Sequence, residues 1–392
     1  MSVIADQMAE VAPNARQAAR APASPLPVLE TRIIGTSEWD SAIAGFDEVC
    51  QEQLFAFAIS RWPHVQQEPM LFLRDGEVVG GSLVMIQRLP LGLGKIAVSK
   101  WGPMLKSAAD PDADLLHAAM IEALISEHAD KRGHMLSVLP RASITAVNHA
   151  YERLSARGFK RGSELMFPNR YIVALRLDDA AQRKSFHQKW RYHLNKSQKA
   201  GLSFEHAGPE RLGEFETLYT AMTDRKQFPD HSAYETIAAL MQLPDPLRPE
   251  LFFVRHQGET VAGALIFKAG DRAVYLYGAT NDKALPLRAG YFLQWNIIRW
   301  LRDHTCATWY DLGGTDGFQG LHQFKKGMVG DAGVIRPVPP VANYASNPLA
   351  FLAGTGAFAA RDAFYQVRRV VTGWLNPKAR PTQSRAVDGA DE

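Results

Sequence analysis

Cysteine is nearly absent from this chain of 392 residues, which contains only Cys50 and Cys306. Two cysteines provide neither a disulfide framework nor a cysteine-rich zinc site. A chain of this length can bury a core large enough to fold without such cross-links. The simplest compartment is therefore the reducing cytoplasm, and no metal is expected.

Long apolar runs and a strong charge imbalance are missing as well. No stretch approaches the roughly 20 apolar residues that span a bilayer, which argues against an integral membrane protein. Lys and Arg number 44 against 41 Asp and Glu, and a net charge of +3 is too small to indicate nucleic acid as the main partner. Any anion site must therefore come from a local cluster of basic residues.

Several catalytic motifs are also absent. The sequence has no H-E-x-x-H, G-x-S-x-G or C-x-x-C, so zinc proteases, α/β-hydrolases and thiol oxidoreductases lack support. The glycine-rich stretch "YDLGGTDGFQGLHQFKKGM" (310–328) fits neither G-x-x-x-x-G-K-[ST] nor G-x-G-x-x-G. A nucleoside-triphosphate loop is thereby excluded.

What the sequence does contain is an internal repeat. "LFLRDGEVVGGSLVMI" (71–86) and "LFFVRHQGETVAGALIF" (251–267) both read as a strand, a Gly-Glu turn and a second strand. After each hairpin come a strand ending in aromatic-Gly, a helix and another short strand. A repeat at this long spacing indicates duplicated domains. Each copy is predicted to be an α/β (α+β) unit with a hairpin core and a strand-helix-strand crossover.

Composition and repeat together divide the chain into five parts. They are a disordered leader (1–29), a first domain (30–165), a second domain with the candidate active site (166–345), an amphipathic C-terminal helix (346–376) and a disordered tail (377–392).

A basic helix is predicted near the start of the second domain. The stretch "RKSFHQKWRYHLNKSQKAGL" (183–202) has six Lys or Arg and no acid, with Phe186, Trp190 and Leu194 four residues apart on one face. Arg191 suits bidentate contact with phosphate, and Lys196 supplies a point charge. The segment is either an anion site for a pyrophosphate or tRNA backbone, or a solvated helix face.

The end of the second crossover strand is where ligands are expected to collect. There Asp311 can orient an attacking amine or cap a turn, and the N-H groups around Gly313 and Gly314 can form an anion nest. On the preceding strand, Tyr275 and Tyr277 are predicted to share one side. Tyr277, at the strand end, is a candidate for lining an acceptor groove, although half-buried tyrosines are common in strands.

Four stretches in this order resemble the FemA/FemB/FemX (FemABX) family within the BioF2-like acetyltransferase superfamily. They are "KWRYHLNKSQKAGL" (189–202), "VYLYGATND" (274–282), "YFLQWNIIRWLRDHTCATWYDLGG" (291–314) and "GLHQFKKGM" (320–328). The resemblance implies two tandem GNAT-like (acyl-CoA N-acyltransferase-like) domains that arose by duplication. It further implies transfer of an amino acid from aminoacyl-tRNA to a peptidoglycan precursor.

The family resemblance also implies roles for two residues of the opening stretch. The ammonium of Lys325 would stabilise the oxyanion of the reacting carbonyl, and the ring of Phe324 would pack beside the tRNA end or the peptide. A plain surface lysine is the alternative for Lys325. Where the family usually carries a second Arg in the basic helix, this chain has Asn195, which departs from the expected phosphate contact.

Two further functions remain open on the residues alone. Arg288 and Gly290 match part of the [Gln/Arg]-x-x-Gly-x-[Gly/Ala] loop that binds coenzyme A, which would fit an N-acyltransferase acting on a polysaccharide, lipid or amino-sugar. A tight left-handed turn is the alternative explanation for Gly290. The other function is a non-catalytic protein that binds a nucleotide- or lipid-linked precursor.

The expected partners are aminoacyl-tRNA, through its acceptor end, and a nucleotide- or lipid-linked envelope precursor. No tightly bound cofactor is expected, because tRNA or acyl-CoA would act as a substrate. The stripe from Ala357 to Trp374 in the C-terminal helix, with Arg361 beside it, predicts either packing on the first domain or contact with an anionic membrane. The sequence predicts no oligomeric state.

Overall fold

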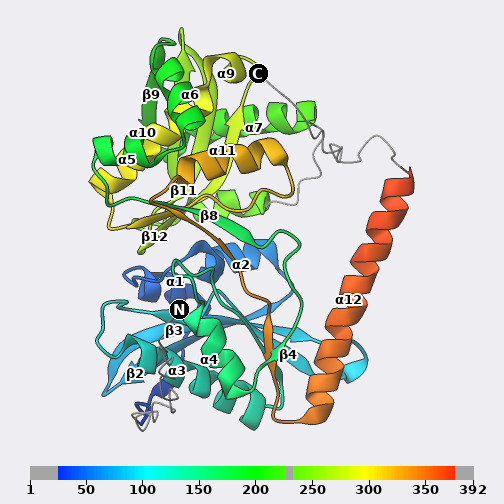
Figure 1. Ribbon diagram of the computed structural model, residues 1–392. Coiled ribbons are helices and arrows are strands. Elements are labelled where there is room, and N and C mark those ends of the chain that lie inside the picture. Colours follow the sequence, from blue (N-terminus) through cyan, green and yellow to red (C-terminus); the bar gives the residue numbers. More distant parts are fainter. Residues whose placement is uncertain (1–24, 227–232, 376–392) are drawn as a thin grey trace, which may run out of the picture.

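A computed structural model describes residues 25–226 and 233–375. In Figure 1 the first sheet lies below the second, and α12 (Pro348–Leu375) runs along one side of both. Most of the predicted leader (1–29) and all of the predicted tail (377–392) lie outside the described residues.

The first sheet is built mainly from the first half of the chain. Its strand order is β1 (Glu30–Ile33), β2 (Gln66–Arg74), β3 (Glu77–Arg88), β4 (Lys95–Lys100), β6 (Met135–Leu139), β15 (Ala342–Tyr344) and β7 (Lys160–Arg161), with β5 (Met104–Leu105) paired to β3.

The second sheet has the same kind of order. Its strands run β14 (Val334–Pro337), β8 (Asn169–Ala174), β13 (Trp309–Asp311), β12 (Arg272–Thr280), β11 (Glu259–Phe267), β10 (Glu250–His256) and β9 (Leu202–Ala207).

Helices cover both sheets. They are α1 (Thr36–Ile43), α2 (Phe55–Arg61), α3 (Ala113–Leu124), α4 (His149–Arg157), α5 (Asp179–Ser185), α6 (Gln188–Gln198), α7 (Leu212–Lys226), α8 (Ile237–Leu240), α9 (Ala284–Leu287), α10 (Ala289–His304), α11 (Gln319–Val329) and α12. Short 3-10 turns include η4 (Pro209–Arg211) and η5 (Tyr234–Thr236).

The predicted duplication is confirmed. β2 pairs antiparallel with β3, and β4 runs parallel to β6 across α3; β10 pairs antiparallel with β11, and β12 runs parallel to β13 across α10. The hairpin turns also match, because both residues of Asp75-Gly76 and of Gln257-Gly258 have positive φ. Such turns have the twist that two adjacent strands require.

One predicted domain boundary needs correction. Residues 342–344, which the sequence assigned to the second domain, form β15 and pair with β6 and β7 in the first sheet. The reason is a buried polar contact that short-range patterns do not reveal. Asn343 is buried and accepts a hydrogen bond from Ser137 of β6 at 2.7 Å.

The two domains share part of their hydrophobic core. One cluster joins Trp39 and Phe57 of the first domain to Leu247 and Phe267 of the second. The backbones also meet closely, since the N-H of Asp271 donates to the carbonyl of Asp47 at 2.6 Å. The domains are therefore packed together and not merely linked.

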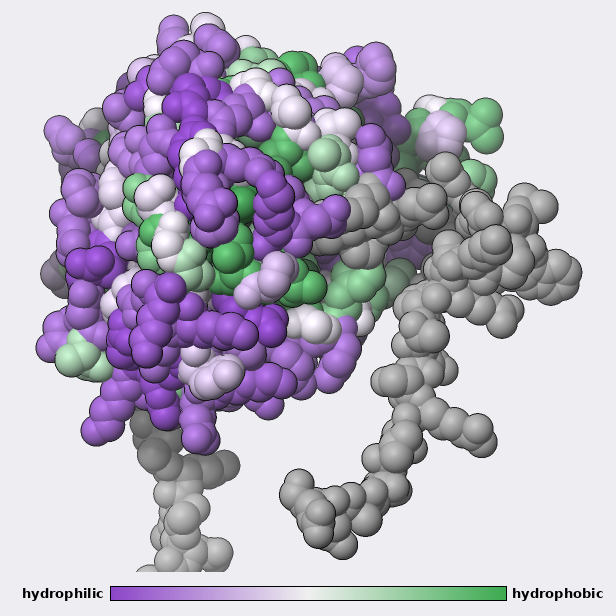
Figure 2. Space-filling view, turned by 90° about the horizontal axis from the view of Figure 1, so that it is seen from above, coloured by the Kyte–Doolittle hydropathy of each residue, from purple (hydrophilic) through white to green (hydrophobic). Residues whose placement is uncertain are grey.

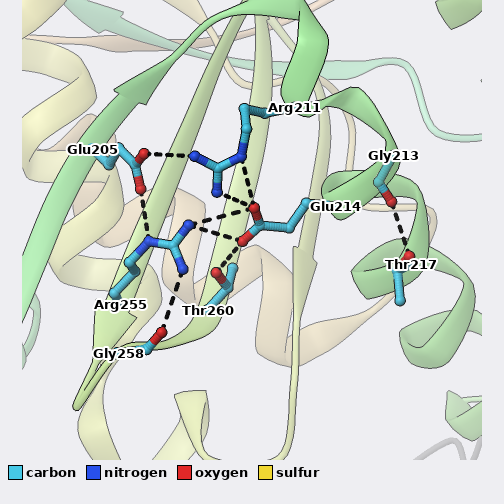
Figure 3. Close-up of polar contacts among 8 residues, drawn as sticks. All are labelled: Glu205, Arg211, Gly213, Glu214, Thr217, Arg255, Gly258 and Thr260. Carbon is cyan, nitrogen blue, oxygen red and sulfur yellow. Dashed lines mark hydrogen bonds and ion pairs between the residues drawn. The ribbon is translucent and has the colours of Figure 1, made fainter.

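An ion-pair network fastens the start of α7 to the second sheet (Figure 3). Arg255 of β10 binds Glu205 of β9 at 2.7 Å and Glu214 of α7 at 3.1 Å, while Arg211 binds both carboxylates. Hydrogen bonds from Arg255 help to lower the pKa of Glu205. These side chains are partly exposed, so the network orients α7 more than it stabilises the fold.

The surface at the second-domain end is mostly hydrophilic, with hydrophobic residues showing in a smaller area between polar ones (Figure 2). Within the described residues, none of the helices is long and apolar enough to cross a bilayer.

Replacing the buried Leu247 by Ala should destabilise the protein by about 2–5 kcal/mol, because the side chain is 1% exposed and fills the core shared by the domains. Leu285→Ala, at a position 72% exposed, should change stability by less than about 0.5 kcal/mol. Urea unfolding measures both, and equal effects would contradict a shared core.

Candidate active site

Asp311 ends β13 and is 3% exposed. Its carboxylate accepts hydrogen bonds from Nε of Arg170, at 3.1 and 3.2 Å to the two oxygens, and from the N-H of Gly313 at 2.9 Å. Burial alone would raise the pKa of Asp311, but Arg170 and Arg272 hold it below its ordinary value. Asp311 is thus an ionised, buried anchor for the loop that follows it.

Lys325 reaches the same loop from α11. Its ammonium donates to the carbonyl of Leu312 at 2.6 Å and to the carbonyl of Gly314. Burial lowers the pKa of Lys325 to about 8, and Arg170 adds to this effect. The alternative of a plain surface lysine is wrong, since the residue is 7% exposed. Two of the three N-H bonds of the ammonium are used by the loop.

The loop does not form the anion nest predicted around Gly313 and Gly314. Gly313 adopts a left-handed conformation (φ 77°) and gives its N-H to Asp311, while the carbonyl of Gly314 faces Lys325. The glycines therefore shape the loop around its own acid and base.

Phe324 lies in an aromatic cluster formed by three helices. Its ring is 4.9 Å from that of Tyr291 (α10) and 6.2 Å from that of Trp190 (α6), and Tyr291 also contacts His193 at 4.9 Å. Trp190 is buried, and its indole Nε1 has no hydrogen-bond partner among the described residues. Nδ1 of His193 is likewise unpaired there.

Arg288 borders this cluster at the N-terminus of α10. It has the left-handed conformation (φ 57°) that the sequence suggested for Gly290, whereas Gly290 lies inside the helix. Nε of Arg288 is buried and unpaired within the described chain. Burial lowers the pKa of His193, and the nearby Arg288 lowers it further, which fits a neutral imidazole beside a guanidinium.

The predicted basic helix is interrupted. α5 ends at Ser185 and α6 begins at Gln188, because Phe186 turns into the core with an extended backbone. Arg191 donates to the carbonyls of Lys184 and Phe186 across this break. Its guanidinium therefore closes the break between the helices, and Arg191 is less suited to phosphate than the sequence suggested.

Asn195 and Lys196 differ in their surroundings. Asn195 accepts a hydrogen bond from Arg183 of α5 at 2.7 Å, so it ties the two helices together. Lys196 is exposed, and within the described residues it makes no ion pair. Of the basic positions predicted to bind phosphate on α6, Lys196 is the one left facing solvent.

Tyr277 lies on the other face of the second sheet from Phe324. A bulge shifts the register of β12, so that Tyr275 packs with the α6 and α10 side while Tyr277 packs against Tyr219 and Tyr234. The prediction that the two phenols share one side is wrong. Burial raises the pKa of Tyr277 above its ordinary value, as expected for a core phenol.

Sequence reasoning missed Arg170 and Trp101. The guanidinium of Arg170, besides binding Asp311, lies over the ring of Trp101 at 5.1 Å. Trp101 belongs to the first domain, so this contact joins that domain to the candidate site. One signal was available, since Arg170 is a charged residue in the strand that flanks β13.

The donor set of the described residues suits no metal, because nowhere do three His, Cys, Asp or Glu side chains gather in a way that could hold one. The chemistry available is instead that of a buried ammonium, a buried carboxylate and aromatic rings.

Comparison with known proteins agrees with this geometry. The FemAB family model matches residues 68–234, and a GNAT acetyltransferase domain model matches residues 184–326. Over 77 residues the chain is 35% identical to lipid II:glycine glycyltransferase of Staphylococcus aureus, which is 18% of this chain and 18% of that protein. The chain thus spans under a fifth of the curated relatives it matches.

Solved structures share the fold across most of the chain. The crystal structure of FemX has a TM-score of 0.65 and 19% identity, covering 81% of this chain and 98% of that one. A conserved protein from Bacteroides thetaiotaomicron has a TM-score of 0.52 and 15% identity, covering 81% and 98%.

The fold and the domain matches define a protein of two GNAT-like domains in tandem. Within that class, the chain belongs to the FemABX family.

Replacing Asp311 by Ala should destabilise the protein by about 3–5 kcal/mol, because Arg170 would be left partly buried without its partner. Glu205→Ala, which breaks the more exposed network, should cost about 1 kcal/mol or less. Urea unfolding distinguishes them. An Asp311→Ala cost no larger than that of Glu205→Ala would show that the buried pair does not hold the loop.

Proposed function

We propose that this protein is a FemX-like aminoacyltransferase that moves an amino acid from aminoacyl-tRNA to an amine of a cell-envelope precursor of the peptidoglycan type. The observation that carries the proposal is the ammonium of Lys325, buried, held by two loop carbonyls and adjacent to the aromatic cluster at Phe324. The matches to the FemAB family model and to a lipid II:glycine glycyltransferase support it.

The reaction needs little from the protein beyond position and charge. The acceptor amine forms a bond to the ester carbonyl carbon of the donor, and the carbonyl oxygen becomes an oxyanion. Lys325 stabilises this charge with its remaining N-H. The carbon–oxygen bond to the tRNA ribose then breaks, and the proton lost by the amine ends on the leaving hydroxyl. No side chain is assigned as the general base.

The donor end is assigned to the aromatic cluster. Stacking on rings such as Phe324 and Tyr291 suits the bases at an RNA terminus. The unpaired N-H groups of Trp190 and Arg288 suit its phosphates or sugar hydroxyls. Lys196, on the exposed side of α6, remains a candidate for a phosphate of donor or acceptor.

A coenzyme A-dependent N-acyltransferase is the second candidate, and one observation favours it. The unpaired Nε of Arg288 lies at the N-terminus of the 16-residue helix α10, where main-chain N-H groups favour a pyrophosphate. In either case the donor is a substrate. The proposed site of action is the cytoplasm, at or near the inner face of the membrane.

Lys325→Ala should lower kcat for transfer by about a hundredfold or more, because an oxyanion partner is lost. Lys326→Ala is the matched control, since Lys326 is the exposed neighbour on the same helix. The assay offers labelled aminoacyl-tRNA and, separately, labelled acyl-CoA with envelope precursors. Thermal unfolding of the variant checks that the loop is intact. Transfer by Lys325→Ala at the wild-type rate would refute the assignment.

The rate should also depend on pH through Lys325. The lowered pKa of about 8 means that the ammonium is lost as the pH rises through 8, so kcat should fall there. Lys325→Arg keeps its charge and should show a slower but flat profile over the same range. Spontaneous ester hydrolysis is subtracted with an enzyme-free control. A wild-type rate that does not fall above pH 8 would contradict the role of the charged form.

A further inference from the structure

Exposed apolar side chains gather where α12 meets the β3–β4 hairpin. Leu91 and Leu93 at the hairpin tip are 95% and 57% exposed, and Leu349 and Leu352 on α12 are 74% and 70% exposed. The two elements are neighbours, because Leu89 and Ile96 at the base of the tip form one cluster with residues of α12. In Figure 1 the hairpin tip and α12 lie on the same side of the molecule.

The tip has an unfavourable backbone. Leu91 adopts the left-handed conformation (φ 58°) that a bulky side chain rarely takes, and its side chain is almost fully exposed. Contacts within the described chain therefore do not compensate for this conformation. A strained, exposed leucine at a loop tip points to a partner outside the molecule.

The base of the tip carries two like charges. Arg88 and Lys95 are directly opposite each other across β3 and β4, a pairing that repels. Neither forms an ion pair with any residue that the structure describes. Anions outside the chain are the missing counter-charge.

The outward side of α12 continues the apolar surface. Leu349, Leu352, Gly356, Ala359 and Ala363 are all exposed and fall three or four residues apart, so they form one uncharged stripe. The opposite side, with Phe351 and Phe358, packs on the first sheet. At 28 residues the helix is about 42 Å long, and the stripe lies along its surface and not around it.

The same side leads to the candidate active site. Asp362 of α12 accepts a hydrogen bond from Ser163 at 2.6 Å, and the segment that follows Ser163 carries the half-exposed Phe167. The ring of Phe167 lies against Gly317 in the loop between Asp311 and α11. Phe318 and Leu321, at the start of α11, are exposed beside it.

We propose that Leu91, Leu93, Leu349 and Leu352, with Arg88 and Lys95, form a docking face for a membrane of anionic lipids. The leucines enter the interfacial region, α12 lies in the plane of the surface, and the two cations bind lipid phosphates. This orientation brings the loop before Lys325 towards the bilayer. That last step rests on the proposed function, because only a lipid-linked acceptor requires it.

The test uses the full-length protein and vesicles of phosphatidylglycerol or phosphatidylcholine, with binding measured by co-sedimentation. The wild type should bind phosphatidylglycerol vesicles, and added salt should weaken binding. Leu91→Ser combined with Leu93→Ser should weaken it about tenfold, and Arg88→Gln combined with Lys95→Gln should do so at least as strongly. Val28→Ser is the matched control, because Val28 is 91% exposed at a position remote in sequence.

Binding by the leucine variant equal to that of wild type would overturn the proposal. So would a wild type that ignores vesicles but forms a dimer that the leucine variant loses in sedimentation velocity, since the face would then join two copies. Vesicle binding needs no transfer reaction, so its outcome is separate from that of the proposed activity. With a nucleotide-linked acceptor, the leucine variant should retain wild-type transfer.

Discussion

The ion pair between Asp311 and Arg170 holds together the part of the second domain on which the candidate site depends. It keeps a carboxylate ionised inside the protein, and that carboxylate fixes Gly313 and the turn after β13. The turn presents the two carbonyls that bind Lys325. The same guanidinium lies over Trp101, so the first domain contacts the site through one side chain.

The two copies of the fold have divided their tasks at equivalent positions. In the second copy, the end of the crossover strand carries Asp311 and leads to Lys325. In the first copy it carries Arg141, which lies near Asp271 of the second domain at 3.8 Å and donates to the carbonyl of Glu48. Arg272 is buried beside it, and burial lowers its pKa to about 10. The first strand end thus serves the contact between domains, and the second serves chemistry.

Much of this could be predicted from short-range patterns. The hairpins follow from glycine turns, and the crossovers follow from apolar periodicity, so the fold and the placement of Asp311 at a strand end were accessible. The pattern of Phe186, Trp190 and Leu194 identified buried residues correctly but missed the break between α5 and α6, because a run of buried positions does not reveal where the backbone leaves the helix. The bulge that separates Tyr275 from Tyr277 depends on pairing with β11, which no local signal encodes. Arg170 and Trp101 are distant in sequence, so only the packed fold brings them together.

The return of β15 to the first sheet affects how the protein is made. A ribosome must have synthesised the whole second domain before residues 342–344 can pair with β6 and β7. Until then the edge of β6 has no strand beside it on that side, and an open edge is a site for wrong pairing between chains. The amino-terminal domain is thus the first to be translated but the last to be completed, and cutting the gene between the two domains would leave that sheet one strand short.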